Sequence, residues 1–206
     1  VGARLLKLGR HKALPLHPTA EVNNLTELLT GNEQKELLKI ARDTIVAYVT
    51  SGTVPAAQAA SPGLNLLSGC FVTIKQKGQL RGCIGNFISD KPLCLLVQEM
   101  AISAATRDPR FYPMKEHDLE DFELDISVLS PLWKAASVEE IQVGTHGIYI
   151  IKGSYRGVLL PQVATEYGWD RDEFLRHTCI KAGLPENAWQ GECDIYIFSA
   201  QVFGET

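Results

Sequence analysis

Two segments of this chain share one pattern, and the repetition restricts the fold more than any other feature of the sequence. The first has Ile74-Lys75, a glycine turn and then Leu80–Ile84, which reads Leu-Arg-Gly-Cys-Ile. The second has Ile151-Lys152, a turn at Gly153 and then Tyr155–Leu159, which reads Tyr-Arg-Gly-Val-Leu. Apolar and β-branched runs on both sides of a glycine turn predict a β-hairpin.

A helical pattern follows each hairpin. We therefore predict an α+β fold in which two similar β-hairpin-plus-helix units form a pseudo-symmetric compact body of sheets flanked by helices. Chance similarity between two short segments is the alternative to a duplication. If the repeat is real, the two Arg-Gly segments occupy related positions.

Periodicity and cap signals predict the other elements. Thr30 and Glu33 have the spacing of a capping box that opens a helix to about residue 50, and Asp90 is expected to cap a helix that ends near residue 106. Residues 51–68 are rich in Ser, Gly, Ala and Pro and predict an irregular connection. The remaining predictions are hairpins over 69–84 and 147–160, strands over 122–128 and 193–202, and helices over 161–168 and 170–182.

The charge is distributed unevenly along the 206 residues, whose formal net charge is −4. Residues 1–22 have a balance of +3, while the rest has 16 basic and 23 acidic residues, a balance of −7. An acidic body argues against a broad nucleic-acid groove, because phosphate neutralisation provides most of the affinity of such proteins; DNA binding is therefore the weakest hypothesis.

The predicted organisation is a basic arm over 1–25, extended or disordered, and one domain over 26–206 with two sub-units at about 26–130 and 131–206. No apolar run approaches the roughly 20 residues that span a bilayer, so we expect no membrane association. The five cysteines have no Cys-x-x-Cys spacing and lie in apolar contexts. We expect reduced thiols in a cytoplasmic protein.

The run Arg81-Gly82-Cys83-Ile84-Gly85 is the first candidate for chemistry. On a regular strand, Arg81 and Cys83 project to the same side, and a guanidinium beside a thiol favours the nucleophilic thiolate. Gly82 and Gly85 let the backbone turn or approach a ligand closely. The alternative is a buried, structural cysteine between glycines.

Three further groups could contribute. Asp108 and Arg110, on a loop stiffened by Pro109, could clamp a substrate or form a structural ion pair. His146 could act as a base for Cys83 if the fold brings them together. The carboxylates around Glu123 and Asp125 could hold a divalent cation or perform acid–base work. A solvated strand face is the expectation, with docking of a basic partner as the next alternative. No metal site is predicted.

Seven collinear segments resemble the AMMECR domain family, over about residues 33–203. They are Gly69–Thr73, Leu80–Gly85, Asp108–Phe111, Ser127–Pro131, His146–Gly147, Leu160–Ala164 and Lys181–Leu184. The resemblance implies a compact α+β fold of two similar units, without an established reaction. Its signature positions here are Arg81, Gly82, Cys83, Gly85, Asp108, Arg110 and Gln162.

The resemblance also implies a modification pathway shared with Memo-like and radical S-adenosylmethionine proteins, acting on nucleotides or RNA. The leading hypothesis is a component of such a pathway with a pocket around Arg81–Gly85, in which Cys83 and Arg81 are the candidate catalytic residues. The alternative is a non-catalytic module that binds a nucleotide, a small anion or a partner protein in a groove edged by the two Arg-Gly segments. The candidate ligand-binding residues are Gly82, Gly85, Asp108, Arg110, His146 and Gln162. The residues do not distinguish an enzyme from a binding module, and they identify no cofactor.

Overall fold

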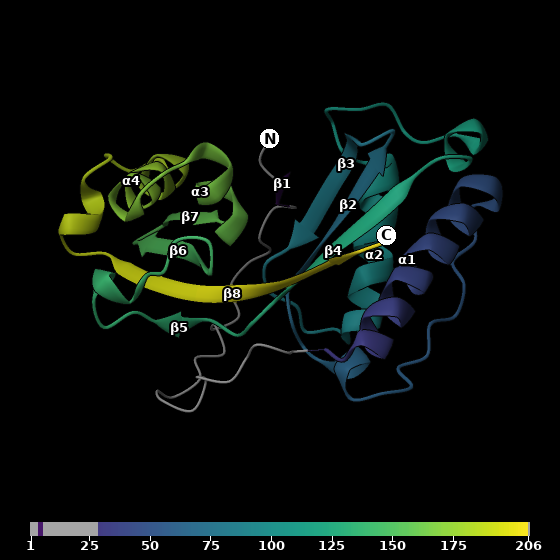
Figure 1. Ribbon diagram of the computed structural model, residues 1–206, viewed down its shortest axis with the longest axis horizontal. Coiled ribbons are helices and arrows are strands. Elements are labelled where there is room, and N and C mark those ends of the chain that lie inside the picture. The colour runs from purple at the N-terminus through teal and green to yellow at the C-terminus, as the bar shows by residue number, and fades with distance from the viewer. Residues whose placement is uncertain (1–3, 6–28, 206) are drawn as a thin grey trace. The chain divides into compact units, whose positions relative to one another are not determined.

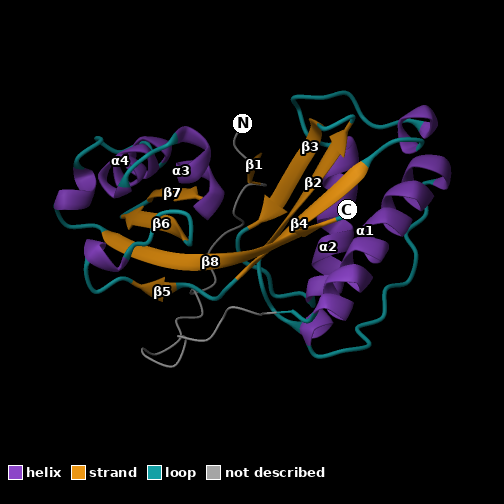
Figure 2. Ribbon diagram, in the orientation of Figure 1, coloured by secondary structure: helices purple, strands orange, loops and turns teal. Residues whose placement is uncertain are grey.

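The computed structural model describes residues 4–5 and 29–205, drawn as ribbons in Figure 1 and Figure 2. Residues 4–5, 29–129 and 201–205 belong to a first compact unit, and 130–200 to a second. The described residues contain four α-helices and eight strands, so the fold is α+β. Apart from Arg4–Leu5, the predicted arm over 1–25 lies outside the described residues. Among the described helices, none is long and apolar enough to cross a membrane.

The first unit consists of a sheet and two helices. Its elements are β1 (Arg4–Leu5), α1 (Gly31–Ser51), β2 (Cys70–Gln76), β3 (Gln79–Asn86), α2 (Leu93–Thr106), β4 (Glu123–Leu129) and the end of β8 (Asp194–Gly204). The strand order is β1-β3-β2-β4-β8, antiparallel for β3-β2-β4 and parallel where β1 joins β3.

Every second side chain along β2 points into the core of this unit. Cys70, Val72 and Ile74 of β2 are fully buried and pack in one cluster with apolar side chains of α1 and α2. The intervening residues of a strand point to the opposite face, where Thr73 is paired across the sheet with Cys83 of β3. The candidate cysteine therefore lies on the face of the sheet that α1 and α2 do not cover.

The second unit repeats the combination of hairpin and helix. Its elements are β5 (Trp133–Lys134), β6 (His146–Lys152), β7 (Tyr155–Leu159), α3 (Pro161–Tyr167), α4 (Arg171–Lys181) and the first part of β8. Strands β7, β6 and β8 are adjacent, and β5 pairs with β8. Ile148 and Ile150 of β6 pack with Phe174 and Leu175 of α4 in a core of their own.

Local signals predicted most element boundaries to within one or two residues. The capping box is confirmed: the Glu33 N–H donates to Thr30 Oγ1 at 3.4 Å, and the Thr30 N–H donates to Glu33 Oε2 at 2.9 Å. The prediction that Asp90 caps α2 is wrong, because the helix begins at Leu93 and Pro92 occupies the cap position without a side-chain bond. The two-residue strand β5 was not predicted, since its sequence is too short to show alternation.

One glycine in each hairpin brings a helix into direct contact with a strand. A Cβ atom on Gly82 would lie 2.2 Å from the carbonyl oxygen of Ala104 in α2. A Cβ atom on Gly157 would lie 2.6 Å from the carbonyl oxygen of Thr178 in α4. Both helices thus pack their last turns against the glycine of an Arg-Gly pair, which is the structural counterpart of the sequence repeat.

We predict that Gly82→Ala and Gly157→Ala each lower the free energy of unfolding by about 1–3 kcal/mol, because the added methyl group meets helix backbone that cannot rotate away. Urea denaturation followed by circular dichroism measures the effect. Gly31→Ala is the matched control, since no atom lies within 4 Å of its added Cβ. Equal stability of all three variants would contradict this account.

Candidate functional site

A β-bulge separates Arg81 from the regular part of β3. Cys83 is opposite Thr73 and Gly82 is opposite Ile74, but the register then shifts so that Leu80 is opposite Lys75. Arg81 is therefore the extra residue of the bulge. We predicted that Arg81 and Cys83 project to the same side, because side chains two apart share a side of a regular strand. The bulge interrupts this alternation between the two residues.

Asp108 and Arg110 bind the backbone of Cys83. The Cys83 N–H donates to Asp108 Oδ2 at 2.9 Å, and Arg110 Nη2 donates to the Cys83 carbonyl at 3.4 Å. The two side chains also form an ion pair with distances of 2.6 Å from Nη2 to Oδ2 and 2.9 Å from Nε to Oδ1. A side-chain pair thus satisfies both backbone groups of Cys83, as a neighbouring strand would.

This pairing determines the charge state of Asp108. The carboxylate is almost fully buried, which opposes ionisation, but the Arg110 guanidinium and the N–H groups of Cys83 and Arg110 hold the pKa of Asp108 below its ordinary value. Asp108 is therefore an anion at neutral pH. In this geometry the pair holds the 107–113 loop to the sheet.

The Cys83 thiol is buried beside a hydroxyl group. Its side chain is 6% exposed, and Thr73 Oγ1 donates to Cys83 Sγ at 3.1 Å. Burial raises the pKa of the Cys83 thiol, while the Thr73 bond and the charge of Arg110 only partly oppose this effect. The cation that acts on the thiol is Arg110, and Asp108 already pairs with it. Cys83 is therefore a neutral thiol at physiological pH.

Arg81 instead points into a cluster formed by the loop after α2. Its Nη2 lies 3.5 Å from Asp118 Oδ2, and its guanidinium carbon lies 4.3 Å from the centre of the Tyr112 ring and 6.0 Å from that of Phe111. We call Arg81, Phe111, Tyr112 and Asp118 the Arg81 cluster. Arg81 is only 7% exposed, yet its Nε and Nη1 have no hydrogen-bond partner among the described residues.

Asp118 anchors this cluster. Its Oδ2 accepts the Lys115 N–H at 2.9 Å, and its Oδ1 accepts the Tyr112 hydroxyl at 3.3 Å. Burial opposes ionisation, but the Lys115 N–H and the Arg81 charge hold the pKa of Asp118 below its ordinary value. One buried carboxylate therefore orients both Arg81 and its aromatic neighbour.

The two glycines of the motif contact the protein itself. Gly82 packs on α2, and a Cβ atom on Gly85 would lie 2.3 Å from the ring of Phe71. These contacts give both glycines a packing role. Their assignment as ligand-binding residues stays a prediction.

His146 and Gln162 belong to the second unit. His146 Nδ1 accepts the Gln142 N–H at 3.2 Å, its ring meets Trp133 edge-on, and burial lowers its pKa. Gln162 lies in the first turn of α3, where its Oε1 is buried without a partner among the described residues. That His146 serves as a base for Cys83 stays a prediction.

The acidic strand face is only partly exposed. Glu123 is exposed, but Asp125 pairs with Lys75 at 2.5 Å and Ser127 is buried. Among the described residues, no group of three His, Cys, Asp or Glu side chains could hold a metal ion.

Sequence reasoning missed Thr73, Tyr112 and Asp118 as parts of the site. Asp118 is one of several acidic residues between 116 and 125, and nothing local marks it as the buried one. The threonine was detectable only through strand register, which pairs it with Cys83.

We predict that Asp108→Asn lowers stability by about 2–3 kcal/mol at pH 7, because it weakens a charge-assisted contact and leaves a partly buried guanidinium unpaired. Since the folded-state pKa is depressed, this stabilisation is complete above the unfolded pKa of about 4 and is lost as pH falls below it. Denaturation at pH 7 and at pH 3 tests both statements. Asp121→Asn, at an exposed site, is the control; a gap from wild type that persists unchanged at pH 3 would contradict the mechanism.

Alkylation of the native protein, followed by mass spectrometry, tests the state of Cys83. We expect Cys193, which is half-buried, to react before Cys83, and the Cys83 rate to rise only above the ordinary thiol pKa of about 8.5. All five thiols should react in denaturant. A Cys83 rate that reaches a plateau well below pH 8.5 would instead demonstrate a stabilised thiolate.

Comparison with known proteins places the chain in a family. The AMMECR1 family model matches residues 38–203. The chain is 44% identical to Protein MK0488 of Methanopyrus kandleri, over 87% of this chain and 91% of that one, and 41% identical to Protein MJ0810 of Methanocaldococcus jannaschii, over 86% and 92%. The crystal structure of the uncharacterized protein PH0010 from Pyrococcus horikoshii matches with a TM-score of 0.79 and 35% identity, over 86% and 94% of the two chains. This chain therefore belongs to the AMMECR1 family.

Proposed function

We propose that this protein is a non-catalytic binding component of a cytoplasmic modification pathway, and that the Arg81 cluster binds an anionic group such as the phosphate of a nucleotide. The observation that carries the proposal is the buried guanidinium of Arg81, whose Nε and Nη1 lack partners among the described residues. Burying charged donors without acceptors costs free energy. An anion that accepts a hydrogen bond from either of these atoms would recover part of that cost.

Tyr112 is the side chain that would move to admit the ligand. Its ring covers the guanidinium of Arg81 at 4.3 Å, but Tyr112 is 59% exposed and its hydroxyl group makes one long hydrogen bond, to Asp118. Rotation of such a side chain into solvent breaks little packing. Arg81 is also paired with Asp118, so its position would persist while Tyr112 moves.

Binding is a better account than covalent catalysis at Cys83. The thiol is buried and its pKa is raised, and the adjacent cation already forms an ion pair with Asp108. Nucleophilic catalysis by cysteine needs a thiolate and commonly a neighbouring base. Among the described residues, Thr73 bonds Sγ, while Asp108 and Arg110 bond the Cys83 backbone, so the hydrogen bonds of Asp108 go to the backbone and to Arg110 and not to the thiol.

The pathway itself is inferred from the resemblance to AMMECR domains, which implies Memo-like and radical S-adenosylmethionine proteins as partners. A non-catalytic component that holds a nucleotide or RNA phosphate would present the ligand to those enzymes. The free state of all five cysteines is compatible with the reducing conditions of the cytoplasm.

Isothermal titration calorimetry with inorganic phosphate, AMP and ATP tests the proposal. We expect at least one of the three to bind, and Arg81→Gln to weaken binding by about 10- to 100-fold, the size of one or two hydrogen bonds to a charged group. Because Arg81→Gln leaves Asp118 without its cation, its fold is checked by circular dichroism.

Tyr112→Ala provides a second variant in which Arg81 is unchanged. We expect faster ligand association in stopped-flow measurements, because no ring has to move. Tyr155→Ala, at an exposed tyrosine of the second unit, is the control. Failure of wild type to bind all three anions, or unchanged affinity in folded Arg81→Gln, would overturn the proposal.

A further inference from the structure

Three aromatic rings stack on one another in the second unit. Tyr167 ends α3 and Trp169 follows it, with ring centres 4.8 Å apart and planes inclined by 16°. Trp169 stacks in turn on His177 of α4, with centres 3.9 Å apart and planes inclined by 7°. Gly168 between the first two has a left-handed backbone, with φ of 68°, which ends the helix and turns the chain back so that the flanking rings can stack.

The stack extends from the core of the second unit to the surface. Trp169 packs against the buried cluster of this unit, whereas Tyr167 is 57% exposed. The Trp169 N–H donates to the Ala164 carbonyl at 2.9 Å, which fixes the chain at this point. The Tyr167 ring is therefore a supported, partly exposed aromatic surface, because Trp169 and His177 stack in series behind it.

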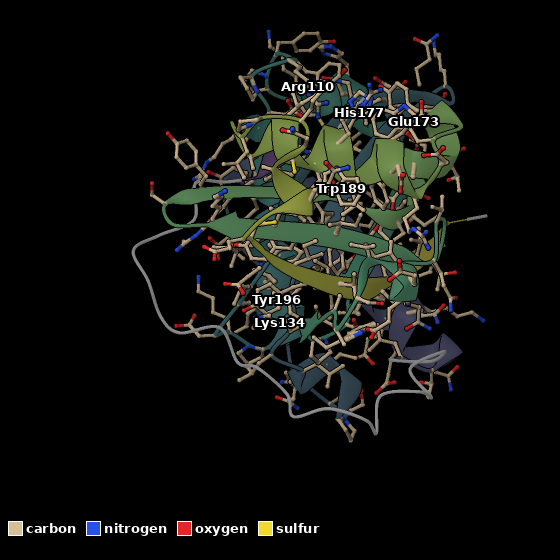
Figure 3. The ribbon with its side chains drawn as sticks, turned by 90° about the vertical axis from the view of Figure 1, so that its left-hand side faces the viewer. Arg110, Lys134, Glu173, His177, Trp189 and Tyr196 are labelled. Carbon is tan, nitrogen blue, oxygen red and sulfur yellow. The ribbon has the colours of Figure 1, made fainter. Side chains whose placement is uncertain are left out.

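The segment that carries Tyr167 and Trp169 is acidic. Residues 166–173 contain four carboxylates and one cation; they are Glu166, Asp170, Asp172, Glu173 and Arg171. Glu173 precedes His177 by one helical turn, and Figure 3 labels both on α4. The capping box of α4 holds two of the carboxylates in place, since Asp170 Oδ1 accepts the Glu173 N–H at 2.8 Å and Glu173 Oε2 accepts the Asp170 N–H at 3.2 Å.

Stacked rings bordered by carboxylates suit a cation. The face of a tyrosine or tryptophan ring attracts a guanidinium or ammonium group, and the planar guanidinium stacks best. Phosphate groups of a nucleic acid would be repelled by the four carboxylates, although a bare base could stack on Tyr167. The four carboxylates of residues 166–173 therefore favour a cationic ligand over a nucleic acid.

We propose that the Tyr167–Trp169–His177 stack and its carboxylates form a docking surface for an arginine-bearing basic segment of a partner protein. One arginine stacks on the exposed ring of Tyr167, and further basic side chains pair with the carboxylates of residues 166–173. This surface lies in the second unit and is independent of the Arg81 cluster, so each proposal can fail without the other.

The test is titration of the full chain with a short peptide of alternating arginine and glycine, followed by calorimetry and by the NMR signal of the Trp169 indole. We expect binding that weakens with salt, and a further weakening of about two- to fivefold in Tyr167→Leu, the size of an exposed cation–π contact. Tyr155→Leu is the matched control, because Tyr155 is a similarly exposed tyrosine of the same unit and is 52% exposed.

Three outcomes would overturn this inference. Equal affinity of the peptide for wild type and Tyr167→Leu would exclude the stack as the binding surface. Tighter binding of a short oligonucleotide than of the peptide at the same indole would make the surface a base platform. Peptide binding that is observed only after Arg4, Lys7, Arg10 and Lys12 are replaced by glutamine would show that the chain's own basic residues are the occupant.

Discussion

The contact between the Asp108–Arg110 pair and the backbone of Cys83 is the interaction on which the candidate site depends. Beside Cys83, strand β3 has β2 on one side, and these two side chains bond its N–H and carbonyl groups. Buried backbone groups need partners, and an ion pair that supplies both a carboxylate and a guanidinium satisfies one donor and one acceptor together. The same contact draws the 107–113 loop to the sheet, and this places Phe111 and Tyr112 beside Arg81.

The two hairpins illustrate how a small change in register gives similar sequences different side-chain contacts. Gly82 and Gly157 have the same packing role, because each lets the last turn of a helix approach the strand backbone. Their preceding arginines differ. Arg156 is paired in regular register with Ile151, whereas Arg81 is the extra residue of a bulge and extends into the loop cluster around Asp118. A bulge re-aims a side chain without changing its neighbours in the sequence.

Burial explains why the reactive-cysteine hypothesis has little support from the geometry. A guanidinium does lie near Cys83, as the hypothesis required, but it belongs to Arg110 and is paired with Asp108. Desolvation then outweighs the remaining attraction and keeps the thiol neutral. Asp108 and Arg110 were expected either to clamp a substrate or to form a structural ion pair. The same geometry favours the structural ion pair, since their hydrogen bonds go to each other and to the protein's own backbone.

The sequence alone determined the family, the α+β class, the capping box at Thr30 and Glu33, and nearly every element, because these depend on periodicity and on residues a few positions apart. It also identified Arg81, Cys83, Asp108 and Arg110 as the informative positions. Only the tertiary structure decided their partners. The bond from Cys83 to Asp108 joins residues 25 positions apart, and the contact of Arg81 with Asp118 joins residues 37 positions apart. No local pattern encodes which of several acidic residues is buried beside which arginine. The bulge, the loop and the packing of α2 together determine which of these side chains meet.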